Sequence, residues 1–158
     1  MSVQSSSLHK ITPFLWFDNN VEEAVNFYIS IFPNSKIITL HYRGDTVQSI
    51  TFELDGLRLV GFNGGPHFKF TEAISLFVSC ETQEEIDEKY EKLLAGGGQE
   101  SQCGWLKDRF GLSWQVAPPV LVDMLHNKDE KKAQRVMDVM LPMKKLDLAA
   151  LKQAFDQE

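Results

Sequence analysis

The chain has few cysteines and no long hydrophobic run. Its 158 residues include only Cys80 and Cys103, whose spacing matches no metal-binding motif, so we expect two free thiols in a reducing compartment. No apolar stretch approaches the length of a membrane helix, and the segment 1–7 lacks the apolar core of a signal peptide. These absences predict a cytoplasmic protein with no membrane partner.

The chain also lacks an excess of basic residues. It has 16 Lys and Arg against 22 Asp and Glu, which gives a net charge of −6. Proteins that bind nucleic acid or anionic membranes through their charge need a positive surface, so we expect neither partner. Phenylalanine is abundant instead, with 11 residues, and this favours an aromatic-lined interior over disorder.

The order of the elements predicted for the first half begins with a strand and a helix. Ile11 to Phe17 is a continuous apolar run typical of a buried strand, which Pro13 confines to an edge or a bulge. Asn20 starts a helix with an acidic first turn, and Pro33 stops it. Three strands follow, at 36–42, 47–54 and 57–62.

The same order begins again after a Gly-rich loop at 63–70. The segment 73–80 is predicted to be a strand, and Thr82 with Glu85 forms a capping box for a helix that the glycines at 96–98 end. A short strand at 99–103 leads into a hairpin at 103–116, whose tight turn runs from Asp108 to Gly111. Each half is therefore strand, helix, strand, strand, strand.

This order predicts an α+β protein with tandem βαβββ modules. The paired modules span 10–117, at about 10–65 and 72–117, behind a flexible tail at 1–9. Residues 118–158 form a helical C-terminal extension with a Met-rich apolar face. We interpret that face as core or dimer contact in preference to a cofactor site.

Two consecutive βαβββ modules in one short chain resemble the vicinal oxygen chelate superfamily, which includes glyoxalase I, bleomycin-resistance proteins and extradiol dioxygenases. The closer likeness is to its PhnB-like group, which often carries a demethylubiquinone methyltransferase label. Three stretches carry this likeness: ITPFLWF at 11–17, EEA at 22–24 with FY at 27–28, and CGWLKDRFGLSWQ at 103–115. The resemblance covers roughly 10–140. It implies a glyoxalase-like fold, a small-molecule cavity between half-barrels, and a homodimer.

Metal enzymes of the superfamily hold a divalent ion with four side chains, from the first, fourth, fifth and eighth strands. The resemblance places these positions on or near Ile11, Gly61, Ala73 and Gln115. Only Gln115 could ligate, and one amide is too few for a divalent ion, so we expect no cofactor. A divalent metal stays possible if loop residues are recruited, the candidates being His9, Asn63, His67 and Glu72.

The methyltransferase label agrees poorly with the pattern. A Rossmann-type S-adenosylmethionine enzyme needs a glycine-rich turn between a parallel strand and the helix after it. The glycines at 96–98 follow a helix instead, and the first strand enters its helix through Asp18-Asn19-Asn20. We therefore disfavour this activity.

The polar residues of the hairpin are candidates to line a site. Strand alternation places Gln115 opposite Trp114 and Val116, which should pack under the helices, so Gln115 could anchor a ligand or end a solvated strand. Lys107 and Ser113 are further candidates, although Lys107 is equally a surface lysine beside Asp108. Trp105 could stack on a ligand or pack across the hairpin.

Three other residues carry weaker signals. His67 could act as a general base or gate the cavity, or could be polar surface. Asn63 could offer its amide to a ligand or turn the chain. Cys103 could be nucleophilic, but no histidine is adjacent in sequence and buried free cysteines are common.

We therefore favour a metal-independent protein that holds a small organic molecule in an apolar cavity. Gln115 would be its polar anchor, with Asn63 and His67 as further anchors. The alternative is a metal-dependent lyase-like or dioxygenase-like enzyme, and the third reading is the methyltransferase. The sequence leaves open whether any reaction is catalysed.

Overall fold

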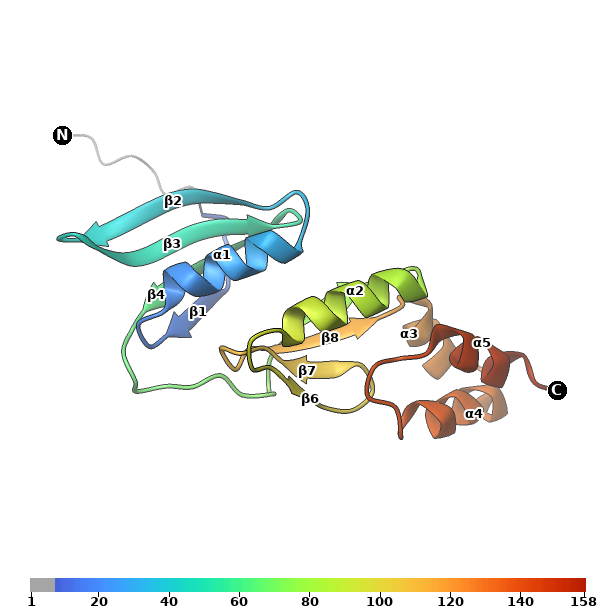
Figure 1. Cartoon of the computed structure of the whole chain (residues 1–158). Coiled ribbons are helices and arrows are strands. Elements are labelled where there is room, and N and C mark those ends of the chain that lie inside the picture. Colours follow the sequence, from blue (N-terminus) through green and yellow to red (C-terminus); the bar gives the residue numbers. More distant parts are fainter. Residues whose placement is uncertain (1–7) are drawn as a thin grey trace. The chain divides into compact units, whose positions relative to one another are not determined.

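The chain divides into two compact units, Met1–Phe70 and Thr71–Glu158, and the computed structural model describes residues 8–158. Each unit contains a four-stranded sheet and a helix that follows its first strand (Figure 1). The predicted α+β fold, with its two βαβββ modules, is confirmed. The predicted tail at 1–9 falls mostly on residues 1–7, which lie outside the described residues.

The first unit contains one helix and a sheet with the strand order β1-β4-β3-β2, in which β1 is parallel to β4. Its elements are β1 (Phe14–Phe17), α1 (Val21–Ile31), β2 (Lys36–Arg43), β3 (Thr46–Leu54) and β4 (Leu57–Asn63). The helix packs on β3 and β4 and buries Val21, Tyr28 and the other apolar residues of its inner face. Burial of these side chains holds the helix to one face of the sheet.

The prediction of a strand over 11–17 is wrong for its first three residues. It begins at Phe14, and Ile11 is 90% exposed. Pro13 explains the late start, because proline has no N–H to donate to a strand pair, although its carbonyl accepts a hydrogen bond from the Val60 N–H at 2.9 Å. The edge position predicted from Pro13 is confirmed.

The start of α1 lies where Asn20 predicts it, but Asn20 makes no capping hydrogen bond with its side chain. The Val21 N–H instead donates to Oδ1 of Asn63, at 3.0 Å. A residue 42 positions later therefore satisfies one of the helix's unpaired donors, which no local pattern could indicate.

The second unit repeats the arrangement, with the strand order β5-β8-β7-β6 and β5 parallel to β8. Its elements are β5 (Ser75–Ser79), α2 (Gln83–Leu94), β6 (Gln99–Glu100), β7 (Trp105–Lys107), β8 (Ser113–Ala117), α3 (Val120–Leu125), α4 (Glu130–Met140) and α5 (Leu148–Asp156). The capping box at α2 is confirmed in its first half, since Thr82 Oγ1 accepts the Glu85 N–H at 3.2 Å. The Glu85 carboxylate accepts the N–H of Glu81, one residue before Thr82, at 3.0 Å. Gly96, at φ +83°, ends the helix as predicted.

The strand predicted at 99–103 is shorter than expected, because β6 ends at Glu100. Cys103 and Gly104 both have positive φ, and their N–H groups donate to the carbonyls of Met143 and Lys144 at 2.8 and 2.7 Å. The chain turns at 101–105 through its own hydrogen bonds, and the C-terminal extension holds the loop between β6 and β7.

The C-terminal extension shares a core with the second unit. Figure 1 shows α3, α4 and α5 gathered at one end of that unit's sheet. Met124 and Met140 are buried in a cluster with Ala117, the last residue of β8. Gln83 at the start of α2 also accepts the Leu148 N–H at 2.8 Å and donates to the Leu146 carbonyl at 3.0 Å. The Met-rich face is therefore core, one of the two roles expected for it.

Asp108 organises the hairpin between β7 and β8. Its buried carboxylate accepts three N–H groups, from Phe110 at 2.8 Å, Leu112 at 3.1 Å and the Trp114 indole at 2.8 Å. Its backbone closes the turn as well, accepting from the Gly111 N–H at 2.9 Å. Charge-assisted bonds to buried N–H groups are among the stronger hydrogen bonds in proteins, so this side chain fixes the shape of the turn.

We expect Asp108→Ala to lower the free energy of unfolding by about 3 kcal/mol or more, because it leaves several buried donors unsatisfied. Urea denaturation measures this loss. Asp156→Ala, at the exposed end of α5, is the control and should change stability by about 0.5 kcal/mol or less. A loss of less than about 1 kcal/mol for Asp108→Ala would contradict this role.

Candidate ligand-binding site

Four of the predicted site residues share one face of the second sheet. Trp105 pairs with Gln115, and Lys107 pairs with Ser113, across the β7–β8 ladder. Directly paired residues project on the same side of a sheet. The opposite side carries Trp114, which is buried as strand alternation predicted. We call the side with Ser75, Trp105, Lys107, Ser113 and Gln115 the polar face.

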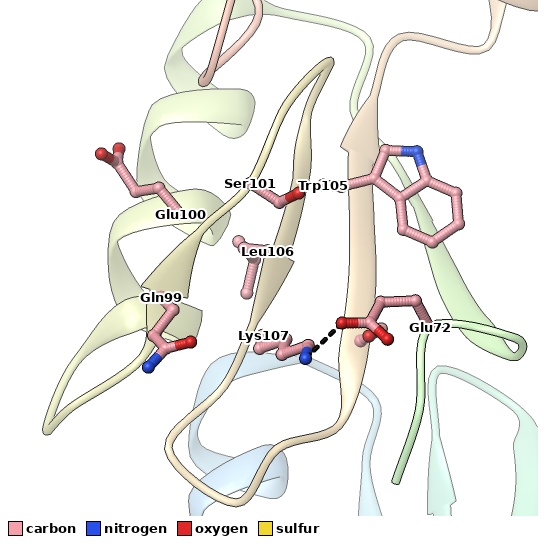
Figure 2. A pocket seen from close by; sticks show the side chains of 8 residues that line it. Glu72, Gln99, Glu100, Ser101, Trp105, Leu106 and Lys107 are labelled. Atoms are coloured by element: carbon pink, nitrogen blue, oxygen red, sulfur yellow. Dashed lines mark ion pairs between the residues drawn. The ribbon is translucent and has the colours of Figure 1, made fainter.

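A pocket of about 170 Å³ lies at the polar face, next to the hairpin turn. Most of its lining is polar, which differs from the apolar cavity that we expected. The lining residues are Glu72, Gln99, Glu100, Ser101, Lys107 and Ser113, with Trp105 and Leu106 as the apolar part. Figure 2 shows these side chains, with the Trp105 indole to one side.

Ser113 is the unusual residue of this pocket. It is 1% exposed, and among the described residues its hydroxyl has no hydrogen-bond partner. A buried hydroxyl without a partner costs about 1–3 kcal/mol, so native proteins rarely retain one without a reason. Its position in the pocket wall indicates a group that a bound molecule could satisfy.

Lys107 supplies the positive charge of the pocket. Its ammonium forms an ion pair with the Glu72 carboxylate, and the two side chains are 34% and 62% exposed. The hydrogen bond from Lys107 holds the pKa of the Glu72 carboxyl below its usual value. The Glu72 carboxyl is therefore charged at neutral pH, and Figure 2 shows this carboxylate turned toward the Lys107 ammonium.

Gln115 is placed beside the pocket. Its Nε2 donates to the Ser75 hydroxyl on β5 at 2.9 Å, and by register it neighbours Phe77 and Trp105. Its amide oxygen has no donor among the described residues, so that oxygen is the atom it could offer to a ligand. The sequence did not single out Ser75, because its position next to Gln115 depends on the exact register between β5 and β8.

Asn63 lies in the first unit, where its side chain holds backbone groups. Oδ1 accepts from the Val21 N–H, and Nδ2 donates to the Val47 carbonyl at 3.1 Å. Its own carbonyl accepts from Gln48 Nε2 at 2.7 Å. These bonds support the chain-turning role that was the second interpretation of this residue.

His67 is exposed in the loop that follows β4. The neighbouring residues Gly65 and Phe68 contact Trp16. The Trp16 indole donates to the Gly65 carbonyl at 2.8 Å, and its ring packs against the Phe68 ring with 4.9 Å between centroids. Trp16 also packs edge-on against Phe62. His67 therefore borders an aromatic surface.

Cys103, considered above as a possible nucleophile, lies against the C-terminal extension. Its Sγ donates to the Met140 carbonyl at 3.7 Å. Burial raises the pKa of this thiol, which opposes formation of the thiolate that a nucleophile requires. Both cysteines are free, as predicted.

The positions expected for metal ligands do not form a donor set. Gly61 faces α1, where an added Cβ would lie 2.8 Å from Val21 Cγ2. Its neighbours on the other side of the sheet are Val60 and Phe62, which cannot ligate. Ala73 precedes β5, and Ile11 precedes β1. Among residues 8–158, no group of three His, Cys, Asp or Glu side chains could hold a metal ion.

Known proteins identify the family. A family model described as 3-demethylubiquinone-9 3-methyltransferase matches residues 9–117. A PhnB protein from Bacillus cereus, whose name proposes the same activity, is 36% identical, with a TM-score of 0.65 over 70% of this chain and 99% of its own. The chain belongs to the PhnB-like group of the vicinal oxygen chelate superfamily.

Other solved structures share the fold of this PhnB-like chain at lower identity. A protein from Pseudomonas aeruginosa is 18% identical over 70% of this chain and 98% of its own, with a TM-score of 0.60. FosX from Listeria monocytogenes, solved with Mn(II) and sulfate, is 19% identical over 77% of this chain and 99% of its own, with a TM-score of 0.55. A search of curated proteins finds no match.

The recognition from sequence is thus confirmed, while the C-terminal helices lie outside the residues that the family model matches. The glycines at 96–98 end a helix, and no nucleotide-binding turn forms there. No helix among residues 8–158 has the length and apolar character needed to cross a membrane.

The burial of Cys80 predicts a low reactivity for its thiol. Burial raises the pKa of Cys80 from 9.0 to about 11, because the buried thiolate loses hydration. We expect Cys80 to resist iodoacetamide at pH 8.5 in the folded protein and to react in urea, as peptide mass spectrometry would show. Because the pKa is raised on folding, its contribution to stability is complete below about pH 9 and is lost as the pH rises toward 11. Rapid alkylation of native Cys80 would contradict this environment.

Proposed function

We propose that this PhnB-like protein binds a small organic molecule without a metal, at the pocket on the polar face of its second sheet. The observation that supports this most is the buried hydroxyl of Ser113, which has no partner among the described residues. A polar group kept in this state is satisfied when a ligand supplies the missing hydrogen bond. Lys107 and the Trp105 indole would hold the charged and apolar parts of the same molecule.

The size of the pocket limits what it can take. Sites for drug-sized ligands occupy about 300–1,000 Å³, and an apolar cavity of about 150 Å³ accommodates benzene. At about 170 Å³, this pocket suits a molecule of one ring, or one end of a larger molecule.

The side chains favour binding over nucleophilic catalysis. A serine nucleophile needs a base within hydrogen-bond distance, and the Ser113 hydroxyl has no partner of any kind among residues 8–158. The Lys107 ammonium is engaged in its ion pair with the Glu72 carboxylate.

The second candidate is a metal-assisted enzyme, because FosX, which shares the fold, was solved with Mn(II). It would need ligands outside the expected positions, since only Gln115 among those positions has a donor atom. Turnover lost on chelation and restored by one divalent ion would support this candidate. Methyl transfer, suggested by the family description, is the third candidate and requires binding of S-adenosylmethionine, which calorimetry would detect.

A native mass spectrum of the untagged protein is the first experiment. We expect the homodimer that the family resemblance implies, without a metal and with any small molecule carried through purification. One metal ion per chain would favour the enzyme. The cytoplasmic location stays a prediction from the sequence.

Ser113→Ala tests the site itself. A thermal-shift screen of small ring compounds would first identify binders of the wild-type protein. We expect Ser113→Ala to weaken those binders about tenfold, because one hydrogen bond is lost. We also expect its unfolding free energy to stay equal or to rise by about 1 kcal/mol, because an unsatisfied buried hydroxyl is removed.

Ser30→Ala is the matched control, because Ser30 is exposed and donates to the Phe27 carbonyl within α1. It should leave binding unchanged. Binders that keep their affinity for Ser113→Ala, or a variant that loses stability, would give Ser113 a structural role and remove it from the site.

A further inference from the structure

Among the described residues that line the pocket there is one ammonium group. A carboxylate of the protein itself already forms an ion pair with this ammonium. Lys107 supplies that ammonium, and Glu72 is its partner (Figure 2). Glu72 precedes β5 and belongs to no strand, and its side chain is 62% exposed. One partner of the ion pair is therefore an exposed side chain on a connecting segment, outside the sheet.

We propose that Glu72 competes with the ligand for Lys107, and that the ligand is a small ring compound with a carboxylate that takes the place of the Glu72 carboxylate. This inference rests on the proposed function, and it adds the chemical class of the ligand and a residue that limits its affinity.

The geometry of the ion pair supports a carboxylate ligand. An ammonium that pairs with one carboxylate can donate to another carboxylate in its place. The second oxygen of the incoming carboxylate can then accept a hydrogen bond from a neighbouring donor. Ser113 pairs with Lys107 across the ladder, so both residues belong to the same face, and its buried hydroxyl has no partner among the described residues. In the proposal this hydroxyl is the neutral donor that accompanies the positive charge.

The remaining wall supports a ring. The Trp105 indole lines the same pocket, and flat aromatic surfaces favour stacking with planar molecules. A pocket of about 170 Å³ is close in volume to the cavity of about 150 Å³ that benzene fills. Benzoate combines the ring and the carboxylate in a molecule of suitable size.

Displacing the Glu72 carboxylate from Lys107 costs a ligand little free energy, but the cost is large enough to measure in its affinity. Exposed ion pairs contribute little, equivalent to a factor of up to about five in an equilibrium constant. The ligand must overcome that factor and the repulsion between two carboxylates. Removing the charge at position 72 should therefore strengthen the binding of an anion and leave a neutral analogue unaffected.

Calorimetric titration with benzoate and benzamide tests the proposal on the full-length protein. The variants are Glu72→Gln, Lys107→Gln and Glu88→Gln. Glu88 is the matched control, because it is an exposed glutamate paired with Lys92 on α2, and its substitution changes the net charge equally. Urea midpoints confirm that each variant is folded.

We expect Glu72→Gln to bind benzoate about threefold or more tightly, with no gain for benzamide and no change in Glu88→Gln. Lys107→Gln should weaken benzoate at least about tenfold, since a hydrogen bond to a charged group is lost. If Glu72→Gln and Glu88→Gln bind benzoate equally, Glu72 is no competitor, and the proposed function stands. If benzoate binds no variant at millimolar concentration, the carboxylate class is overturned, and the Ser113→Ala comparison still decides the proposed function.

Discussion

The three hydrogen bonds to the Asp108 carboxylate are the constraint on which the proposed site depends. They close the turn between β7 and β8 and tie it to the indole of Trp114, which is buried on the opposite side of the sheet. Lys107 and Ser113 are the ladder pair nearest the turn, so the same bonds set their positions. The site can contain a partly exposed lysine and an unsatisfied serine because a buried charged network stabilises the backbone between them.

The two units use one architecture for different surfaces. In each, a helix covers one face of the sheet with apolar side chains, and strand alternation leaves a different set on the other face. In the first unit that other face carries aromatic rings, including Trp16 and Phe62. In the second unit it carries hydroxyl, amide and ammonium groups. The chemistry that we assign to the protein therefore belongs to the second unit, because charged and hydrogen-bonding groups line a pocket there.

The sequence predicted the fold well because its signals are local. The capping box at Thr82, the turn at Asp108 and the glycine stop at 96–98 each depend on residues a few positions apart. It failed where distant segments decide the outcome. Asn63 satisfies the start of α1, and the C-terminal extension holds the loop between β6 and β7, through hydrogen bonds that span many residues.

The site was predicted in part for the same reason. Alternation alone places Lys107, Ser113 and Gln115 on one side of the hairpin, so these candidates come together. The pairing of Lys107 with Glu72 crosses from the segment before β5, and the missing partner of Ser113 is a property of packing. Asn63 shows the opposite case, in which a plausible ligand-binding amide is used by the backbone.

A crystal structure of the protein grown with saturating benzoate tests the central claim most directly. The account predicts the ring beside Trp105, with the carboxylate within hydrogen-bonding distance of Lys107 Nζ and Ser113 Oγ, and with Glu72 turned away. Benzoate bound elsewhere, with the ion pair between Lys107 and Glu72 intact and the pocket without it, would contradict the account.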